Sequence, residues 1–149
     1  PDDPFYTAKS ANFVSEMGRI SFPDQETIDT FVPADKQWPP NGPLWYYHSS
    51  DTNRWRRYRN VADVLESVRN NGYREPENIE ELIESTQNIQ ADAYTCWIEH
   101  FGGDPQCWGL LLWNLCDIWP QISDAIISYD LRPKKAYNAV RSAYGALGR

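Results

Sequence analysis

The chain has 149 residues, with 21 acidic against 14 basic side chains and a net charge of −7. This length is enough for one domain with its own core, while the acidic balance argues against a broad nucleic-acid surface. No apolar run is long enough to cross a membrane. The three cysteines form no C-x-x-C pair and are odd in number, so we expect neither a disulfide framework nor a metal or cofactor site.

The first half of the chain is expected to hold a strand, a short helix and a long loop. Residues 13–15 form a brief apolar run that is typical of a buried strand, and this run ends at the carboxylate of Glu16. Residues 24–30 are expected to form a short helix that its first residue caps. Residues 33–53 are rich in proline and aromatic side chains and contain His48, which indicates an ordered functional loop.

The second half is predicted to be mostly helical. Apolar residues at helical spacing predict helices over 60–70, starting at an asparagine cap, and over 77–101, ending at two glycines. Residues 108–115 form a continuous apolar run of strand length, which suits a strand buried on both faces of a parallel sheet. Residues 132–147 repeat the helical spacing. Two strands joined by helices are β/α units, and two such units cannot close a barrel, so the sequence indicates part of a larger α/β fold.

Several side chains are candidates for a functional site. Glu16 ends the first strand, where β/α-barrel enzymes place catalytic groups, although a solvated acid would look the same in sequence. Trp113 and Asp117 lie on the second strand or just past it. The indole could form the floor of a sugar site and the carboxylate could bind a hydroxyl or orient a neighbour, while a core tryptophan and a turn aspartate are the alternatives. His48 could hydrogen-bond a ligand or lie on the surface.

Two other groups of residues carry weaker signals. Residues 54–59 are basic and aromatic and could touch nucleic acid, but they are brief and lie in an acidic chain. A solvated helix entry that pairs with nearby acids is the favoured interpretation. Cys96 and His100 share a helix face but, with Cys107 and Cys116, they match no metal-ligand spacing.

Three linked segments resemble glycoside hydrolase family 2. Residues 13–23, FVSEMGRISFP, resemble the strand-seven nucleophile segment F-x-S-E-F-G-x-x-S-x-P of that family. Residues 112–120, LWNLCDIWP, resemble the strand-eight segment Y-W-Q-L-N-D-x-W-P of the β-mannosidase and exo-β-glucosaminidase branch. Residues 123–129 and 132–137 resemble the segment S-W-A-I-V-D-Y…R-P-K-x-A-Y that follows. The resemblance implies that residues 1–149 are the C-terminal portion of a (β/α)8 TIM barrel, with strands seven and eight and their helices.

The resemblance also implies a retaining exo-β-glycosidase that acts on terminal β-linked sugars. Glu16 would be the nucleophile that forms a covalent glycosyl-enzyme, and Trp113, Asp117 and Trp119, which match the family pattern, would bind the carbohydrate substrate. The family's acid/base is a Glu after an Asn on strand four, and no such position precedes Glu16. The isolated chain is therefore expected to be inactive and to need the rest of the barrel, or self-association. An alternative pairs Glu16 with Asp117 as two acids of one site.

Four positions depart from the family pattern: Cys116 stands for Asn, Asp124 for Trp, Ser128 for Asp and Met17 for an aromatic residue. These changes bear on the expected sugar more than on the reaction class. The main alternative function is a non-catalytic carbohydrate-binding or accessory module, with the aromatic loop and Trp113 as its platform. Seven tryptophans and nine tyrosines suit that module, and they equally suit a large aromatic core.

Overall fold

The computed structural model describes residues 11–49 and 59–148, which contain both helices and strands, as the predicted α/β class requires. In chain order the elements are β1 (Val14–Met17), α2 (Gln25–Ile28), the 3-10 helix η1 (Ala34–Lys36), α3 (Pro43–Tyr47), α4 (Arg59–Asn70), α5 (Ile79–Gly103), β2 (Leu110–Leu112) and α6 (Lys135–Ala146). The basic segment at 54–59 lies outside the described residues except for Arg59, which begins α4.

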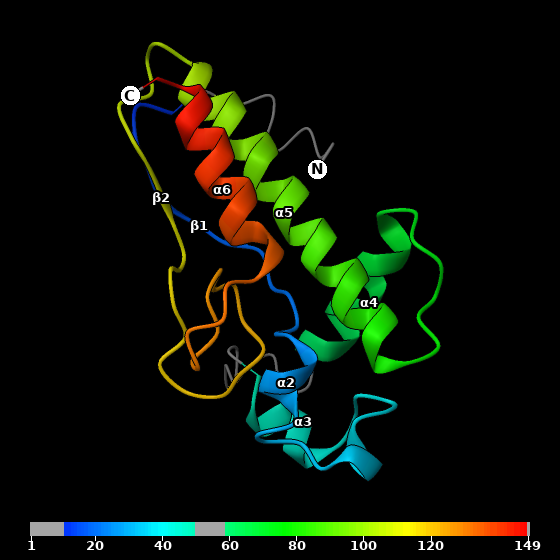
Figure 1. Cartoon of the computed structure of the whole chain (residues 1–149). Helices are drawn as coiled ribbons and strands as arrows, with labels where there is room; N and C mark the ends of the chain where they lie inside the picture. Colours follow the sequence, from blue (N-terminus) through cyan, green and yellow to red (C-terminus); the bar gives the residue numbers. More distant parts are fainter. Residues whose placement is uncertain (1–10, 50–58, 149) are drawn as a thin grey trace.

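Helix α5 contacts α2, α4, α6 and β2. Its N-cap is Asn78, whose side chain accepts a hydrogen bond from the backbone N–H of Glu81, and acidic residues in the first turn complement the helix dipole. Figure 1 shows α6 lying along the C-terminal part of α5. The two strands lie on one side of this helix pair, and α4 lies near the N-terminal end of α5. The apolar faces of α5 and α6 share one core, which contains Ala93, Tyr94, Trp97, Ile98, Phe101, Ala136, Val140 and Ala143.

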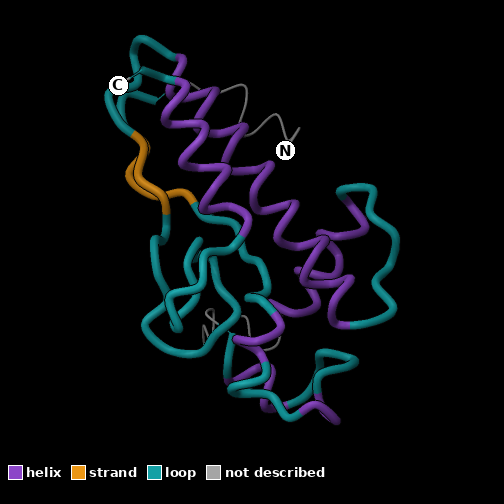
Figure 2. The backbone as a smooth tube through the Cα atoms, in the orientation of Figure 1, coloured by secondary structure: helices purple, strands orange, loops and turns teal. Residues whose placement is uncertain are grey.

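Strands β1 and β2 pair in parallel and lie side by side against this helical layer (Figure 2). Their register joins Val14 to Leu110 and Met17 to Leu112, and these side chains pack onto the α5–α6 core. The expectation of a strand buried on both faces over 108–115 is wrong. Strand β2 has three residues, and among the described residues no further strand or helix layer covers its outer face. Leu111 of β2 is 55% exposed, and the flanking residues Trp108 and Leu115 are 83% and 62% exposed.

A second core lies at the other end of α5. It joins residues that follow β1 to the aromatic segment and to α4, and it contains Phe22, Ile28, Val32, Trp45, Val61, Val64, Val68 and Leu82. Of the predicted aromatic loop at 33–53 the structure describes residues 33–49, here called the aromatic segment, and these contain η1 and α3, so the segment is not wholly a loop. Trp45 is fully buried, and its Nε1 donates a hydrogen bond to the carbonyl of Lys36 at 2.9 Å. Burial of this indole explains the order of a proline-rich segment.

Three predicted helix ends differ from the structure in detail. Asp24 is the N-cap residue of α2, as predicted, but makes no capping hydrogen bond with its side chain. Asn60 lies within the first turn of α4, because that helix begins at Arg59. Helix α5 ends at the two glycines, as predicted, but includes both of them.

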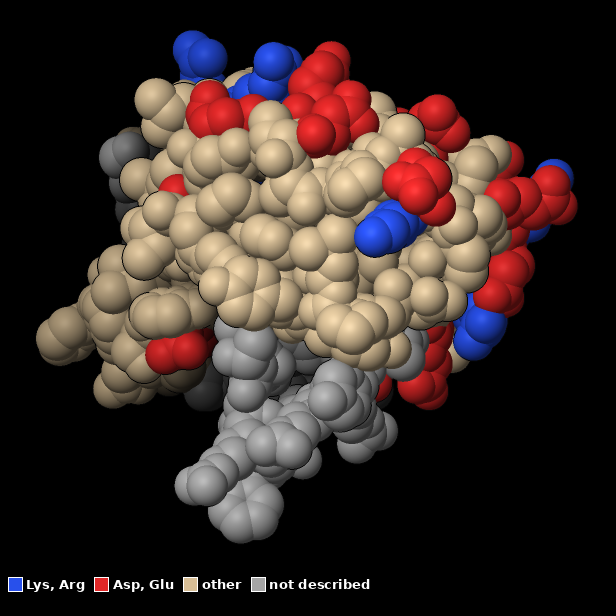
Figure 3. Space-filling model, turned by 90° about the horizontal axis from the view of Figure 1, so that it is seen from below, with Lys and Arg blue, Asp and Glu red and all other residues tan. Residues whose placement is uncertain are grey.

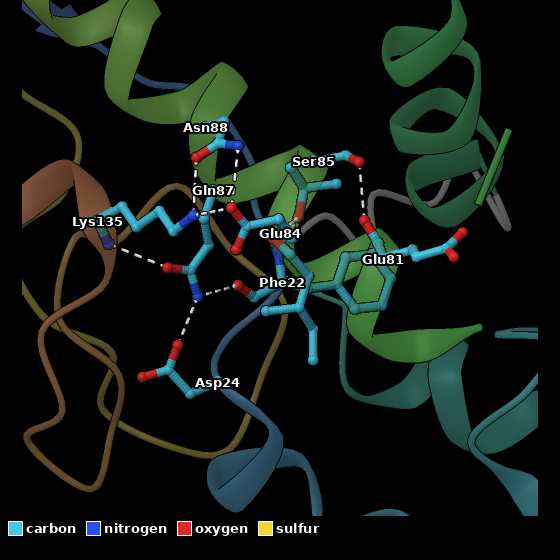
Figure 4. Close-up of polar contacts among 10 residues, drawn as sticks. Phe22, Asp24, Glu81, Glu84, Ser85, Gln87, Asn88 and Lys135 are labelled. Atoms are coloured by element: carbon cyan, nitrogen blue, oxygen red, sulfur yellow. Dashed lines mark hydrogen bonds and ion pairs between the residues drawn. The ribbon is translucent and has the colours of Figure 1, made fainter. Parts of the chain in front are cut away.

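Helix α6 begins three residues later than predicted, and a distant side chain caps it. Lys134 is its N-cap residue but forms no side-chain cap, and Gln87 of α5 takes that role by accepting a hydrogen bond from the Lys135 backbone N–H at 3.0 Å (Figure 4). Gln87 Nε2 also donates to Phe22 O at 3.2 Å and to the Asp24 carboxylate at 2.7 Å. This glutamine thus satisfies one of the open N–H groups that a helix leaves at its start.

The molecular surface carries acidic side chains in separated groups. Figure 3 shows one face on which acidic residues gather along the margins, while the centre is largely uncharged. No helix in the described part of the chain meets the length and hydropathy needed to span a membrane.

Candidate active site

The ends of both strands open into one pocket with a volume of ≈ 550 Å³. Glu16 comes from β1, and Trp113 directly follows β2, so the parallel pairing brings these two candidates to the same edge of the sheet. Both side chains are exposed, Trp113 at 54%. The lining residues are Glu16, Met17, Gly18, Ile20, Trp113, Asn114, Gln121, Ser123 and Asp124.

Gly18 allows three segments to meet at the pocket. A Cβ atom at this position would lie 2.5 Å from the carbonyl oxygen of Trp113 and 2.9 Å from the carboxyl of Asp124. Backbone can approach this closely only where the side chain is absent. The glycine two residues after Glu16 is therefore required by packing. The peptide bond between Trp113 and Asn114 is cis.

Two buried polar residues of α5 hold the pocket segments in place. The hydroxyl of Tyr94 lies 3.1 Å from the carbonyl oxygen of Trp113 and 2.8 Å from that of Asp124, and it accepts a hydrogen bond from the Arg19 backbone N–H at 3.4 Å. Burial raises the pKa of Tyr94 well above its ordinary value, so the hydroxyl keeps its proton. Gln90 Nε2 donates to the carbonyls of Arg19 at 2.7 Å and Asp124 at 3.1 Å, and its Oε1 accepts from Ser21 Oγ at 2.8 Å.

Sequence reasoning missed these positioning residues. Gln87, Gln90 and Tyr94 lie at i, i+3 and i+7 on the buried side of α5, so they share one helical face. Polar side chains at core positions of an otherwise apolar stripe need hydrogen-bond partners. That interruption of the stripe was the available signal, although it does not say which segments the side chains hold.

Asp117 lies outside the pocket lining and is 4% exposed. Its Oδ1 accepts hydrogen bonds from Gln121 Nε2 and Ser123 Oγ, both at 2.6 Å. Gln121 and Ser123 line the pocket, so Asp117 contacts the pocket wall through them. Both roles expected of Asp117, binding a hydroxyl and orienting a neighbour, stay predictions.

Trp119 and His48 form an aromatic cluster next to the pocket, with neither ring in its lining. The two rings stack with centroids 5.3 Å apart, and His48 Nδ1 lies 2.7 Å from the carbonyl oxygen of Pro120. Trp119 Nε1 donates to Gln121 Oε1 at 2.8 Å, which connects the cluster to a lining residue. Tyr47 packs edge-on against Trp119 with centroids 5.4 Å apart. Through these rings, residues 33–49 contact residues 112–120, which resemble the strand-eight segment. The role of residues 33–49 in sugar binding stays a prediction.

A buried lysine lies among the acids of the site. Lys134 is 1% exposed, and its Nζ donates to the carbonyls of Ser21 at 3.4 Å and Ser123 at 3.3 Å. Burial lowers the pKa of Lys134 to about 8, against the opposing effect of Asp117 and Asp124. Burial also raises the pKa of Asp124 to about 6, although Lys134 lowers it. Desolvation therefore outweighs attraction at both groups, which makes the site electrostatically costly.

The described part of the chain contains no cluster of three or more His, Cys, Asp or Glu side chains suited to a metal ion. Cys96, Cys107 and Cys116, all within the described residues, form no disulfide. Cys116 is half-buried and lies after β2, in the segment that leads to α6.

The chain is related to glycosidases. No protein-family model matches it. The related proteins include curated β-mannosidases B: that of Aspergillus niger is 36% identical over 132 residues, and that of Emericella nidulans 40% over 132 residues, with 86% of this chain covered in each case. The chain spans 15% of the length of these relatives. This relationship confirms the resemblance to the β-mannosidase branch of glycoside hydrolase family 2.

Solved structures agree with the sequence relatives. The β-D-mannosidase of Dictyoglomus thermophilum superposes with a TM-score of 0.81 and 28% identity, covering 93% of this chain and 16% of that one. The exo-chitosanase of Amycolatopsis orientalis superposes with a TM-score of 0.68 at 17% identity, covering 88% of this chain and 16% of that one. This second likeness shows a shared fold alone.

Proposed function

We propose that this chain forms one side of the substrate pocket of a retaining exo-β-glycosidase, as the C-terminal portion of a (β/α)8 barrel. Strands β1 and β2 would be strands seven and eight of that barrel. The observation that carries the proposal is that Glu16 and Trp113, at the carboxyl ends of two adjacent parallel strands, line one pocket. Relatedness to β-mannosidases supports a terminal β-linked mannoside as the substrate class.

Glu16 would act as the nucleophile. Its carboxylate oxygen attacks the anomeric carbon as the bond to the leaving oxygen breaks, and a second carboxyl protonates that oxygen. The same second carboxyl then removes a proton from water, which attacks the anomeric carbon and releases Glu16. The two carboxyl groups of retaining enzymes are about 5–5.5 Å apart. We propose that another part of the barrel supplies the acid/base glutamate.

The other site residues would bind and position the sugar. The exposed indole of Trp113 offers a flat apolar face to the C–H groups of a pyranose. Trp119 and His48 would extend that surface through Gln121. The exposed outer face of β2 is where the rest of the barrel, or a second copy of the chain, would pack.

Trapping of the glycosyl-enzyme tests the assignment of Glu16. The complete protein that carries this segment is incubated with 2-deoxy-2-fluoro-β-D-mannosyl fluoride, digested and analysed by mass spectrometry. We expect a stable mass increase of one fluoromannosyl group on the peptide that contains Glu16, and no label in Glu16→Gln. A label on another carboxylate would refute the role of Glu16. Purified residues 1–149 alone should show no turnover of an aryl β-D-mannoside.

A carbohydrate-binding module is the second candidate, because Trp113 is exposed beside the aromatic cluster of Tyr47, His48 and Trp119. It predicts saturable sugar binding without turnover, even in the complete protein. Turnover of an aryl β-D-mannoside by the complete protein that Glu16→Gln abolishes would favour the glycosidase. Saturable binding of methyl β-D-mannoside in calorimetric titration, without turnover and unchanged in Glu16→Gln, would favour the binding module.

A further inference from the structure

The carboxyl of Asp124 is a feature of the pocket that the proposed chemistry does not use. It lines the same pocket as Glu16 and Trp113, in the segment between β2 and α6. The resembling family has a tryptophan at this position. An acidic side chain there changes the surface offered to a ligand from a flat apolar ring to a charged hydrogen-bond acceptor.

The backbone of Asp124 is held firmly. Its carbonyl oxygen lies within hydrogen-bond distance of Tyr94 Oη at 2.8 Å and Gln90 Nε2 at 3.1 Å, both from α5. Its carboxyl packs against Gly18, where even a single added methyl group would lie 2.9 Å away. The side chain therefore has little freedom to turn away from the pocket, which is the preorganisation that a binding group needs.

The carboxylate of Asp124 is half-buried and lies among charged groups. It accepts a hydrogen bond from its own backbone N–H, and the charged groups that act on it are Lys134, Arg19 and Asp117. Burial raises its pKa to about 6 despite the nearby lysine, because burial disfavours the charged form. A carboxylate at a pocket wall that burial penalises is stabilised when a ligand donates a further hydrogen bond to it.

We propose that Asp124 is a sugar-binding residue of the pocket, whose carboxylate accepts a hydrogen bond from a hydroxyl or protonated amino group on the pyranose ring. This inference rests on the proposed function and names one contact of that site. A hydrogen bond between a charged acceptor and a sugar donor in a partly desolvated site changes binding by about 10- to 100-fold. Asp124 would thus replace ring stacking by a directional contact.

Steady-state kinetics of the complete protein test the proposal with Asp124→Leu and Asp124→Asn. For an aryl β-D-mannoside we expect KM to rise about 10- to 100-fold in the leucine variant, with kcat within about threefold of wild type. The asparagine variant keeps the shape and one acceptor oxygen, so its KM should rise less. Asp92→Asn, on the exposed side of α5, is the matched control and should leave both constants unchanged.

The outcomes separate this inference from the proposed function. Unchanged KM in both Asp124 variants, with fluoromannosyl labelling of Glu16 intact, would overturn the binding role alone. If the Asp124 variants lose kcat at constant KM and azide restores kcat, Asp124 is the acid/base, and the binding role is again overturned. Loss of labelling at Glu16 in the wild type would remove the proposed function itself. A parallel assay with an aryl β-D-glucosaminide identifies the donor, because loss of the charge in Asp124→Asn weakens an ammonium contact more than a hydroxyl contact.

Discussion

The α5–α6 helix pair and the β1–β2 strand pair place their apolar side chains in opposite ways. The helices bury their apolar stripes against each other and against the inner face of the strands. Strand β2 leaves Leu111 exposed, and Trp113 and Leu115, which follow the strand, are exposed as well. Apolar sequence therefore predicts burial only where a covering layer exists. An exposed apolar strand face next to a polar pocket is typical of an interaction surface.

Two tryptophans give the strongest test of this contrast. Trp97→Ala, in the α5 core, should lower the free energy of unfolding by about 3–5 kcal/mol, because it removes a large buried side chain. Trp108→Ala, beside β2, should change it by less than about 0.5 kcal/mol, because that indole is exposed. Urea unfolding of both variants measures the difference, and equal losses would mean that the strand face is covered in solution.

The polar face of α5 gives the next largest effect. Gln90→Leu removes the donor to the carbonyls of Arg19 and Asp124 and the acceptor for Ser21. It should lower the free energy of unfolding by about 2–3 kcal/mol, since the buried groups stay unsatisfied. Gln106→Leu, at an exposed glutamine, is the control and should be near neutral. A neutral Gln90→Leu would mean that water replaces the lost hydrogen bonds.

The carboxyl of Asp124 predicts a pH dependence of stability. Its pKa is raised from 3.8 to about 6, so between these values the folded chain keeps a proton that the unfolded chain releases. The free energy of unfolding is therefore highest, as far as this group is concerned, below pH 3.8, and it falls as the pH rises through about 6. Asp124→Asn should lack this loss and be more stable at pH 7 by on the order of 1–2 kcal/mol, discounted for partial exposure.

Denaturant midpoints measured at pH 4, 5, 6 and 7 check this prediction. Parallel profiles for wild type and Asp124→Asn would contradict it. A variant that is more stable but binds sugar less well would fit a group kept for function at a cost in stability.

The smallest stability change is expected on the outer strand face. Leu111→Lys and Leu115→Lys should alter the free energy of unfolding of the chain by less than about 0.5 kcal/mol, because both side chains are already exposed. The same changes should reduce self-association in sedimentation velocity, since charge on a sheet face opposes further packing. Leu131→Lys, exposed away from the sheet, is the matched control. Undiminished association would exclude this face as the contact.

Periodicity predicted the helices well, because a long apolar stripe such as that of α5 depends mainly on local spacing. The motif residues Glu16 and Trp113 were correctly expected at the ends of two strands, since strand order and parallel pairing follow from β/α connectivity. The cap of α6 by Gln87 was beyond sequence reasoning, because its partners are about 50 residues or more apart in the chain. Burial of Asp117 likewise depends on tertiary packing.

The clearance at Gly18 links the permitted sequences of three segments. The residue at 18, the carbonyl of Trp113 and the side chain at 124 occupy one small volume, so a change in one alters what the other two tolerate. Substitutions at these positions should be non-additive: Gly18→Ala should be more damaging beside aspartate than beside a smaller residue at 124. A change between tryptophan and aspartate at position 124 would then be accompanied by changes in neighbouring residues during evolution. Sugar preference would therefore change only when several of these residues change together.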